Sequence, residues 1–303
     1  MAMQVYCYGD EIMNLRTAND DLSRMVPVLT SKAGGCMTAA NWQEANINIA
    51  SYELSSLLMK PGIDFLSMLP DLATYVGWQG ALVLNASFAK RGVNGLYNLR
   101  SDYDGRRTHY SVEDLFALIM HLKPSMVLLP EGVWHTHKAL CQSLAETMNL
   151  YLSVNDRPED GESMQPHGVY FSYDEKTTPS SVMLELLAKH RDRSCYIAGD
   201  LSLPLMLDLV DNGAHFVESD RPATDALCGD VYCSDGQISL KNSDFSMQFE
   251  AIDATCQCTT CSQKLTRAYL HHLLEHTPLL CQRFLVNHNV YYCQEVLRKK
   301  RPC

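Results

Sequence analysis

Three closely spaced cysteines near the C-terminus constrain this chain more than any other feature. They lie in the run Cys256-Gln-Cys258-Thr-Thr-Cys261. Three thiols at this spacing cannot all pair locally as disulfides, but as thiolates they can converge on one tetrahedral Zn²⁺ with a downstream imidazole as fourth ligand. The pattern therefore predicts one structural zinc site of the Cys3His type. The alternative is that the thiols are incidental in a chain with 12 cysteines.

Helical periodicity indicates the fourth ligand. Thr277-Pro278 is a typical helix start, with Thr as N-cap and Pro at the first helical position. A helix that begins there turns His288 toward the interior, and we therefore predict His288 as the ligand. His271 and His272 are the rival ligands, and a hydrogen-bonded core histidine is the alternative role for His288. The expected inward stripe of this helix consists of Leu280, Phe284, His288 and Tyr291.

Around these residues the chain resembles the C-terminal part of the tRNA-guanine transglycosylases. The matched segments follow in one order: Tyr232-Cys-Ser-Asp-Gly-Gln-Ile-Ser-Leu-Lys-Asn242, the three cysteines, Thr266-Arg-Ala-Tyr-Leu-His-His272, and His288-Asn289. One extra residue lies between Cys261 and His271. A weaker resemblance covers most of residues 27 to 292, and it implies the family's barrel with a zinc-binding subdomain inserted near the C-terminus.

The alternation of strands and helices predicts the same fold class. Parallel βαβ units in a domain of this length favour an α/β protein with a (β/α)8-type TIM barrel over an open sheet. We expect an N-terminal extension at 1–25, the barrel at 26–227, and a zinc-binding subdomain with closing helices at 228–303. The expected strands are 80–84, 125–129, 150–154, 167–173, 194–198 and 214–217, with a short one possible at 4–8, and the expected helices are 111–122, 135–148, 179–190 and 203–212.

The charge of the chain limits how it can bind nucleic acid. A net charge of -10 argues against unspecific wrapping of RNA or DNA, so any RNA contact must use a local basic patch. No apolar run reaches the length of a membrane span, and the first residues do not form a secretory signal. We therefore expect a cytoplasmic protein with reduced thiols. The candidate basic patches are Arg106-Arg107, Arg191 with Arg193, and the run from Arg298 to Arg301.

A barrel of this kind carries its reacting groups at the carboxyl ends of its strands, and three of these ends are informative here. They hold Asn85, Glu131 and Glu218. In the resembled enzymes these positions carry three aspartates, which act as general acid/base, as purine ligand and as nucleophile toward the ribose. Asn85 cannot exchange a proton, so the acid/base role is lost there. Glu218 keeps a carboxylate at the nucleophile position on a longer side chain, and Glu131 and Asp104 are candidates for substrate binding.

The middle of the chain indicates a barrel that is shortened or irregular. Between Phe171 and Tyr196 there is room for one helix, whereas the resembled family has a further strand and a Gly-rich loop that line the purine pocket. With the pair Glu218-Ser219, this departure is similar to the non-catalytic accessory subunit of the eukaryotic queuine transglycosylase. The resemblance implies tRNA as partner and a homodimer, or a heterodimer with a catalytic subunit.

Three hypotheses about function follow. The first is a catalytically weak or accessory paralogue in queuosine-type tRNA modification, which binds tRNA, a catalytic subunit or both. The second is an active tRNA-guanine transglycosylase that exchanges guanine for a 7-deazaguanine through a covalent Glu218 intermediate, with Glu131 or Asp104 supplying proton transfer. The third is a non-catalytic barrel whose zinc subdomain is an interaction module, for instance for DNA carrying deazapurines.

Overall fold

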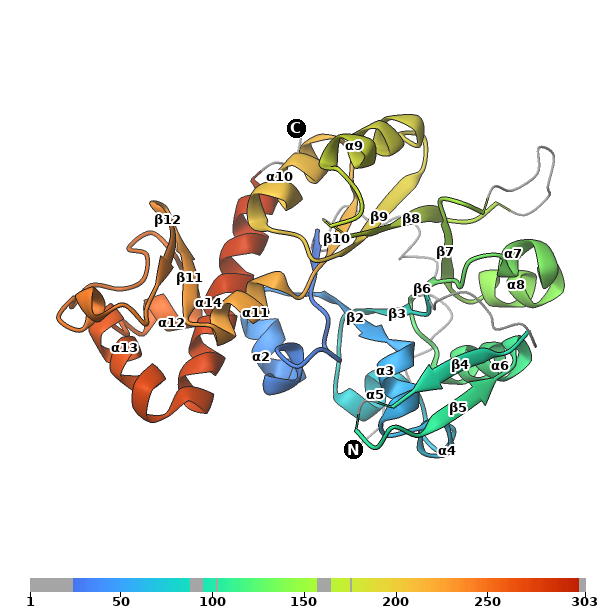
Figure 1. Ribbon diagram of the computed structural model, residues 1–303, viewed down its shortest axis with the longest axis horizontal. Coiled ribbons are helices and arrows are strands. Elements are labelled where there is room, and N and C mark those ends of the chain that lie inside the picture. The colour runs from blue at the N-terminus through green and yellow to red at the C-terminus, as the bar shows by residue number, and fades with distance from the viewer. Residues whose placement is uncertain (1–23, 88–94, 102, 157–164, 175, 300–303) are drawn as a thin grey trace, which may run out of the picture.

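An eight-stranded parallel sheet forms the centre of the computed structural model (Figure 1). The structure describes residues 24–87, 95–101, 103–156, 165–174 and 176–299, so the possible strand at 4–8 lies outside the described residues. The strands follow the order β1-β10-β9-β8-β7-β6-β3-β2. Their bounds are β1 Met25–Val26, β2 Ile49–Glu53, β3 Ala81–Asn85, β6 Met126–Leu128, β7 Asn149–Ser153, β8 Gly168–Tyr173, β9 Ser194–Gly199 and β10 Phe216–Glu218.

The sheet curls into a nearly closed barrel. Its two outer strands, β1 and β2, meet just beyond the end of β1, where Val28 and Ser51 form a parallel bridge. The Leu29 amide donates to the Ser51 carbonyl at 2.8 Å, and the Ser51 amide donates to the Pro27 carbonyl at 2.9 Å. This closure satisfies the edges that an open sheet would expose. The TIM-barrel prediction is therefore confirmed.

The barrel is not shortened by the loss of a strand from its sheet. The sheet has eight strands, so the prediction that a strand is missing from the middle of the chain is wrong. Instead, the connection from β7 to β8 contains no helix in its described part, residues 154–156 and 165–167. A single helix, α9 (Ser180–Lys189), then joins β8 to β9.

The remaining connections are built from helices of the outer ring. Most expected helices form, but the one expected at 135–148 is divided in two because the backbone at His137 leaves the helical region. The helices and the one hairpin of this ring are α2 Ala39–Glu44, α3 Leu54–Met59, α4 Ile63–Leu66, α5 Leu72–Val76, β4 Tyr97–Arg100, β5 Arg107–Tyr110, α6 Val112–Leu122, α7 Val133–Thr136, α8 Lys138–Ala145, α10 Leu203–Asp211 and α11 Arg221–Leu227.

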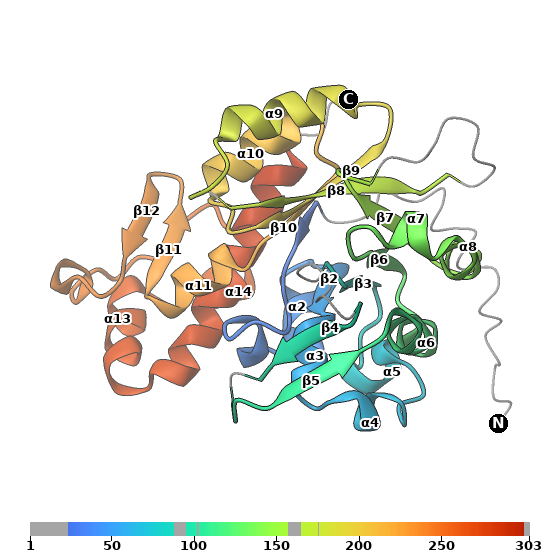
Figure 2. The same cartoon turned by 45° about the vertical axis from the view of Figure 1, so that its right-hand side comes forward.

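A small subdomain is inserted after α11, and the chain then returns to the barrel (Figure 2). The insertion contains β11 (Asp230–Cys233), β12 (Gly236–Ser239), the short 3-10 helix η3 (Ser243–Phe245), α12 (Thr259–Ser262) and α13 (Arg267–His276). The long helix α14 (Pro278–Arg298) begins in this subdomain and ends beside α10. One helix therefore belongs to both parts of the molecule.

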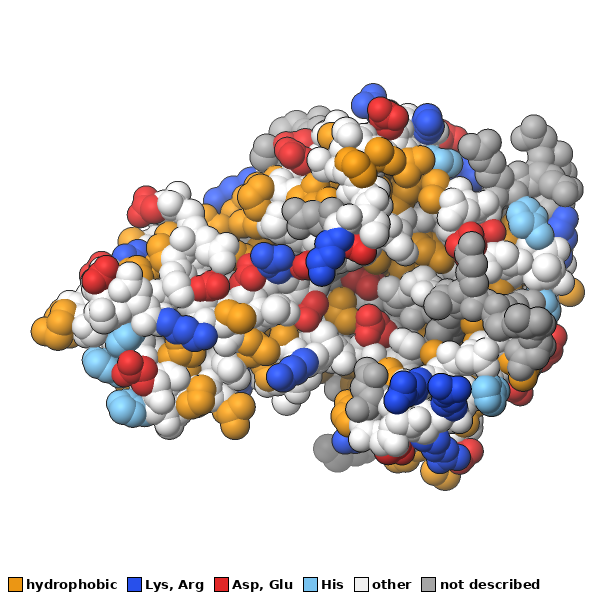
Figure 3. Space-filling view, in the orientation of Figure 1, with side chains coloured by type: hydrophobic (Ala, Val, Ile, Leu, Met, Phe, Trp, Pro, Cys, Tyr) orange, Lys and Arg blue, Asp and Glu red, His pale blue; other side chains and the backbone are white. Residues whose placement is uncertain are grey.

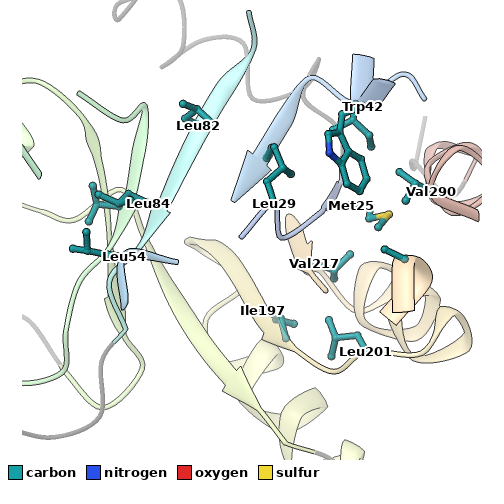
Figure 4. Packing of buried hydrophobic residues seen from close by; sticks show 14 of the residues in the cluster. Met25, Leu29, Trp42, Leu54, Leu82, Leu84, Ile197, Leu201, Val217 and Val290 are labelled. Carbon is teal, nitrogen blue, oxygen red and sulfur yellow. The ribbon is translucent and has the colours of Figure 1, made fainter. Parts of the chain in front are cut away.

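Buried apolar side chains join α14 to the barrel. Figure 4 shows Met25 of β1 between Trp42 of α2 and Val290 of α14. All three are fully buried, and the Met25 amide lies 3.4 Å from Oε1 of Gln294 on the same helix. The prediction of a helix from Pro278 is confirmed, but the expected inward stripe is partly wrong. Leu280 is exposed because it lies on the outer side of the first turn of α14, whose Cys281 is buried against α13, whereas the middle turns are buried on most sides.

Candidate metal centre and barrel-end site

The structure brings Cys256, Cys258, Cys261 and His288 together inside the inserted subdomain. Nδ1 of His288 lies 3.7, 3.3 and 3.4 Å from the three sulfur atoms in that order. Zinc bonds of about 2.3 Å to sulfur and 2.0 Å to nitrogen in a tetrahedron place S and N about 3.5 Å apart. The four side chains therefore fit a tetrahedral metal ion, and the group can hold one.

The second nitrogen of His288 fixes which ring atom faces the thiols. Nε2 lies 2.7 Å from the Tyr232 carbonyl oxygen. A carbonyl can only accept, so Nε2 carries the proton and donates it, which leaves the Nδ1 lone pair directed at the sulfur atoms. His288 is fully buried on α14, so the surrounding helices lock the ring in this orientation. A buried imidazole with this tautomer is arranged as a metal ligand.

Local hydrogen bonds shape the loop that carries the cysteines. Asp253 accepts the Ser234 and Thr255 amides, both at 2.7 Å, and the Cys256 amide at 3.2 Å. Sγ of Cys258 accepts the Cys261 amide at 3.3 Å and so caps the short helix α12. Hydrogen bonds from the neighbouring Cys256 and Cys258 thiols lower the pKa of Cys261. Hydrogen bonding among the same thiols raises the pKa of Cys256, so the loop favours the metal-binding thiolate form at Cys261.

The rival histidines lie in a different group on α13. Nδ1 of His271 is 2.7 Å from the Leu240 carbonyl, and Nε2 faces Glu275 at 3.7 Å. His272 approaches the same Glu275 carboxylate at 4.0 Å. The structure thus groups neither histidine with the three cysteines, and His288 remains the predicted fourth ligand.

A second polar site lies at the carboxyl ends of the strands, around Glu218 of β10. Glu218 is 3% exposed, and both of its carboxyl oxygens have a donor. Nδ2 of Asn85 donates to Oε1 at 2.8 Å, and the Tyr196 hydroxyl donates to Oε2 at 2.6 Å. The structure therefore joins two of the predicted strand-end residues and adds Tyr196. Sequence reasoning missed Tyr196 as a site residue, because its place on an expected strand does not show which strand it pairs with.

The orientation of the Asn85 amide is set from its other side. Oδ1 accepts the Ser87 amide at 3.1 Å and the Ser87 hydroxyl at 2.5 Å. Only the NH2 group is then left to face Glu218. An aspartate at position 85 would instead bring two carboxylates into contact, which favours a shared proton.

Burial and hydrogen bonding shift the pKa of Glu218 in opposite directions. Burial raises the pKa of Glu218, and the hydrogen bonds from Tyr196 and Asn85 offset only part of that effect. Aromatic side chains fill the barrel next to the carboxyl group, with the rings of Tyr151 and Tyr196 5.6 Å apart and those of Tyr196 and Phe216 5.8 Å apart. The result is a packed barrel end around a buried carboxyl group with a raised pKa.

The other candidate residues lie outside this hydrogen-bonded group. Glu131 is exposed after β6, and Asp104 is exposed at the turn of the β4–β5 hairpin. A hydrogen bond from Ser101 lowers the pKa of Asp104, which is the opposite of what a proton donor needs. A further carboxylate, Asp156, follows β7 and accepts the Gly132 amide with both oxygens at 3.0 and 2.9 Å. Its position after an expected strand was a signal that sequence reasoning passed over.

The fold and the site together define the class of this protein: it is a parallel α/β barrel with a Cys3His group in an inserted subdomain. A family model described as "Queuine tRNA-ribosyltransferase" matches residues 168–302. Among the curated relatives, the queuine tRNA-ribosyltransferase of Clostridium perfringens (strain SM101 / Type A) is 33% identical over 111 residues. That alignment covers 36% of this chain and 29% of the relative. The aligned part of the chain therefore spans less than a third of the relative's length.

Two other relatives align over nearly the whole chain. The queuine tRNA-ribosyltransferase of Thermotoga neapolitana is 24% identical over 88% of this chain and 83% of its own length. That of Thermotoga petrophila is 22% identical over 96% of this chain and 89% of its own length. Together with the family model, these relatives support the assignment of this chain to the tRNA-guanine transglycosylase family. Within the described residues, no helix is long and apolar enough to cross a membrane.

Proposed function

We propose that this chain is a catalytically weak or accessory member of its family, which acts in queuosine-type tRNA wobble modification by binding tRNA, a catalytic subunit or both. The state of Glu218 carries the proposal. Both of its oxygens are hydrogen-bonded inside a packed barrel end, and burial raises its pKa. Donors that already occupy both carboxyl oxygens make Glu218 less available as a nucleophile, and Asn85 cannot relay a proton to a departing purine.

We propose Zn²⁺ as the ion of the Cys3His group. All four tetrahedral positions would be filled by protein side chains, which is the arrangement of structural rather than catalytic zinc. When bound, the ion cross-links the cysteine loop to α14, the helix that also packs on the barrel. His288 supplies this connection, and its hydrogen bond to the Tyr232 carbonyl ties β11 into the same unit.

We propose the β4–β5 hairpin as a contact surface for tRNA. In its antiparallel register Arg100 lies directly opposite Arg107, although like charges at such positions repel. Lys60 adds a third positive charge, with Nζ 5.0 Å from the ring centre of Tyr103, which is 74% exposed. Figure 3 shows Lys and Arg side chains gathered over these strands. Clustered cations beside an exposed aromatic ring suit a phosphate backbone and an unstacked base.

We further propose that the inserted subdomain carries the contact with a second subunit. Several large apolar side chains are exposed on it, and exposed apolar surface of this kind commonly marks a protein interface. The partner is a second copy of this chain or a catalytic transglycosylase subunit, and the location is cytoplasmic. The division into 1–25, 26–227 and 228–303 is part of the same proposal. The exposed side chains are Met247, Phe249, Tyr269, Leu279 and Leu280.

Exchange of labelled guanine tests the proposal. Purified tRNA with a G-U-N anticodon is incubated with this protein alone, with a catalytic transglycosylase subunit alone, and with both. We expect no exchange by this protein alone, and either stimulation of the catalytic subunit or co-purification with it. Exchange by this protein alone at the rate of a catalytic subunit would overturn the proposal.

The alternative is an active enzyme with Glu218 as nucleophile, which is favoured by the carboxylate kept at the end of β10. It predicts a covalent adduct between protein and tRNA that survives denaturing gels and disappears in Glu218→Gln. The accessory proposal predicts that neither the wild type nor Glu218→Gln forms an adduct under single-turnover conditions.

The tRNA surface has its own test. In Arg100→Ala/Arg107→Ala, removal of two phosphate contacts should weaken tRNA binding and lower the slope of log K against log salt by about 1.5 to 2. Arg191→Ala is the control, because this exposed arginine precedes β9 and so lies at the amino ends of the strands. An unchanged salt slope in the double variant would exclude the hairpin as the contact.

A further inference from the structure

His271 is a buried histidine whose tautomer the structure fixes. Its side chain is 5% exposed, and Nδ1 lies 2.7 Å from the carbonyl oxygen of Leu240. Because a carbonyl only accepts, Nδ1 carries a proton, and Nε2 is left with either a lone pair or a second proton. This is the hydrogen-bonding arrangement that orients a histidine ligand toward a metal.

Nε2 of His271 faces a carboxylate with a gap between them. Oε1 of Glu275, one helical turn further along α13, lies 3.7 Å from Nε2, and Oε2 of the same group lies 4.0 Å from Nδ1 of His272. Both separations exceed the length of a hydrogen bond. Two ligand atoms bound to one divalent ion at about 2.1 Å each lie about 3 to 4 Å apart. The spacing therefore fits a bridging cation better than a bridging proton.

We propose that His271, His272 and Glu275 form a second metal site, separate from the Cys3His group. All three ligand atoms lie within 4.8 Å of one another. Two imidazoles with one carboxylate suit Zn²⁺ and the other borderline divalent ions rather than Ca²⁺ or Mg²⁺. The proposal does not depend on the proposed function.

This second site is open on one side, unlike the Cys3His group. The side chains of His272 and Glu275 are 53% and 56% exposed, so water or a donor atom from a bound macromolecule can complete the coordination. The hydrogen bond from His271 to the Leu240 carbonyl holds the site against the body of the subdomain. A bound ion would therefore fix the outer face of α13 while leaving free coordination positions on the surface.

Metal counting on the full chain tests the proposal. The protein is equilibrated with Zn²⁺, and the bound metal is measured by elemental analysis and by calorimetric titration. We expect the wild type to hold one ion more than Glu275→Gln, and His272→Ala to weaken that ion's affinity tenfold or more. Both substitutions are at exposed positions and should leave the fold intact. Bound Cu²⁺ should show two imidazole nitrogens by electron paramagnetic resonance.

His276→Ala is the matched control. His276 is exposed on the same helix, four residues after His272, and could pair with it in a two-histidine site. The proposal expects unchanged metal content in this variant. Equal metal content in wild type and Glu275→Gln would overturn it, as would a loss in His276→Ala. A doubly protonated His271 ring by ¹⁵N NMR with Zn²⁺ present would also overturn it, because Glu275 and the imidazolium would then be an ion pair.

Discussion

At the scale of single residues, Glu218 makes the clearest prediction. Its pKa is raised in the folded protein. The protonated group therefore contributes stability that is fully present below the ordinary pKa of a glutamate and is lost as pH rises through the raised value. Relative to Glu218→Gln, the wild type should become less stable as pH rises, because the glutamine stays neutral. The glutamine can still accept from Asn85 and can turn its NH2 group to the Tyr196 hydroxyl.

Thermal melting of the two proteins from about pH 4 to pH 8 checks this prediction. The difference in melting temperature should shift progressively in favour of the variant as pH rises. Glu131→Gln is the control, since it removes an exposed carboxylate at another strand end. A pH-independent difference between wild type and Glu218→Gln would show that position 218 does not titrate in this way.

Asn85 makes a second prediction at this scale. In Asn85→Asp the donor to Oε1 of Glu218 is lost, and a second carboxylate takes its place in contact with the first. We expect destabilisation of about 1 to 3 kcal/mol at neutral pH, and less at acid pH, where a shared proton can bridge the pair. Chemical denaturation at the two pH values measures the difference. Equal destabilisation at neutral and acid pH would contradict the placement of Asn85 next to Glu218.

The residue scale also shows what sequence reasoning can reach in this site. Asn85 and Glu218 were predicted from their positions at strand ends, and the structure places them 2.8 Å apart. Tyr196 was not predicted as their partner, because a tyrosine within a strand is most often a core residue. Its hydroxyl reaches Glu218 only through the pairing of β9 with β10. That register is a property of the folded sheet, not of either segment alone.

At the scale of elements, periodic helices and apolar strands were predictable, whereas the shortest strand and the polar hairpin were not. The helices at α6, α9, α10 and α14 follow from caps and apolar spacing. Strand β1, of two residues, has too few positions for a periodic signal and is stabilised by pairing in the barrel, whereas β10, of three residues, was expected at 214–217. The β4–β5 hairpin was missed because its outer face is polar. Its inward Tyr97 and Tyr110 are buried and hold it to the barrel.

The cysteine loop gives the prediction at this scale. Cys258→Ser should remove the bound zinc and disperse the inserted subdomain, because structural zinc contributes folding free energy of order 10 kcal/mol in small domains. Metal analysis and the melting curve measure both effects. Cys141→Ser is the control, since Cys141 is equally buried but lies on α8. Unchanged zinc content and melting in Cys258→Ser would exclude the site.

At the scale of the whole molecule, α14 connects the two parts that the proposed function assigns to different tasks. Its first turns pack on α12 and α13 in the subdomain, and its later turns contact α11, α10, α2 and β1 of the barrel. Asn289 on this helix donates to the Pro222 and Asp230 carbonyls at 3.0 and 2.9 Å, at the point where the insertion leaves the barrel. A subunit bound to the subdomain would therefore be held in a fixed position relative to the strand ends and the basic hairpin.

The exposed apolar face of the subdomain tests this arrangement. Met247 and Phe249 are 73% and 70% exposed, so their substitution by glutamine should not disturb folding. If this face binds a second subunit, Met247→Gln/Phe249→Gln should weaken association tenfold or more in sedimentation experiments, because a few large apolar side chains dominate such interfaces. Zinc content should stay unchanged. Met68→Gln is matched in exposure, at 74%, but follows α4 on the barrel. Equal association of all three proteins would place the partner elsewhere, and a loss in Met68→Gln alone would place it on the barrel side.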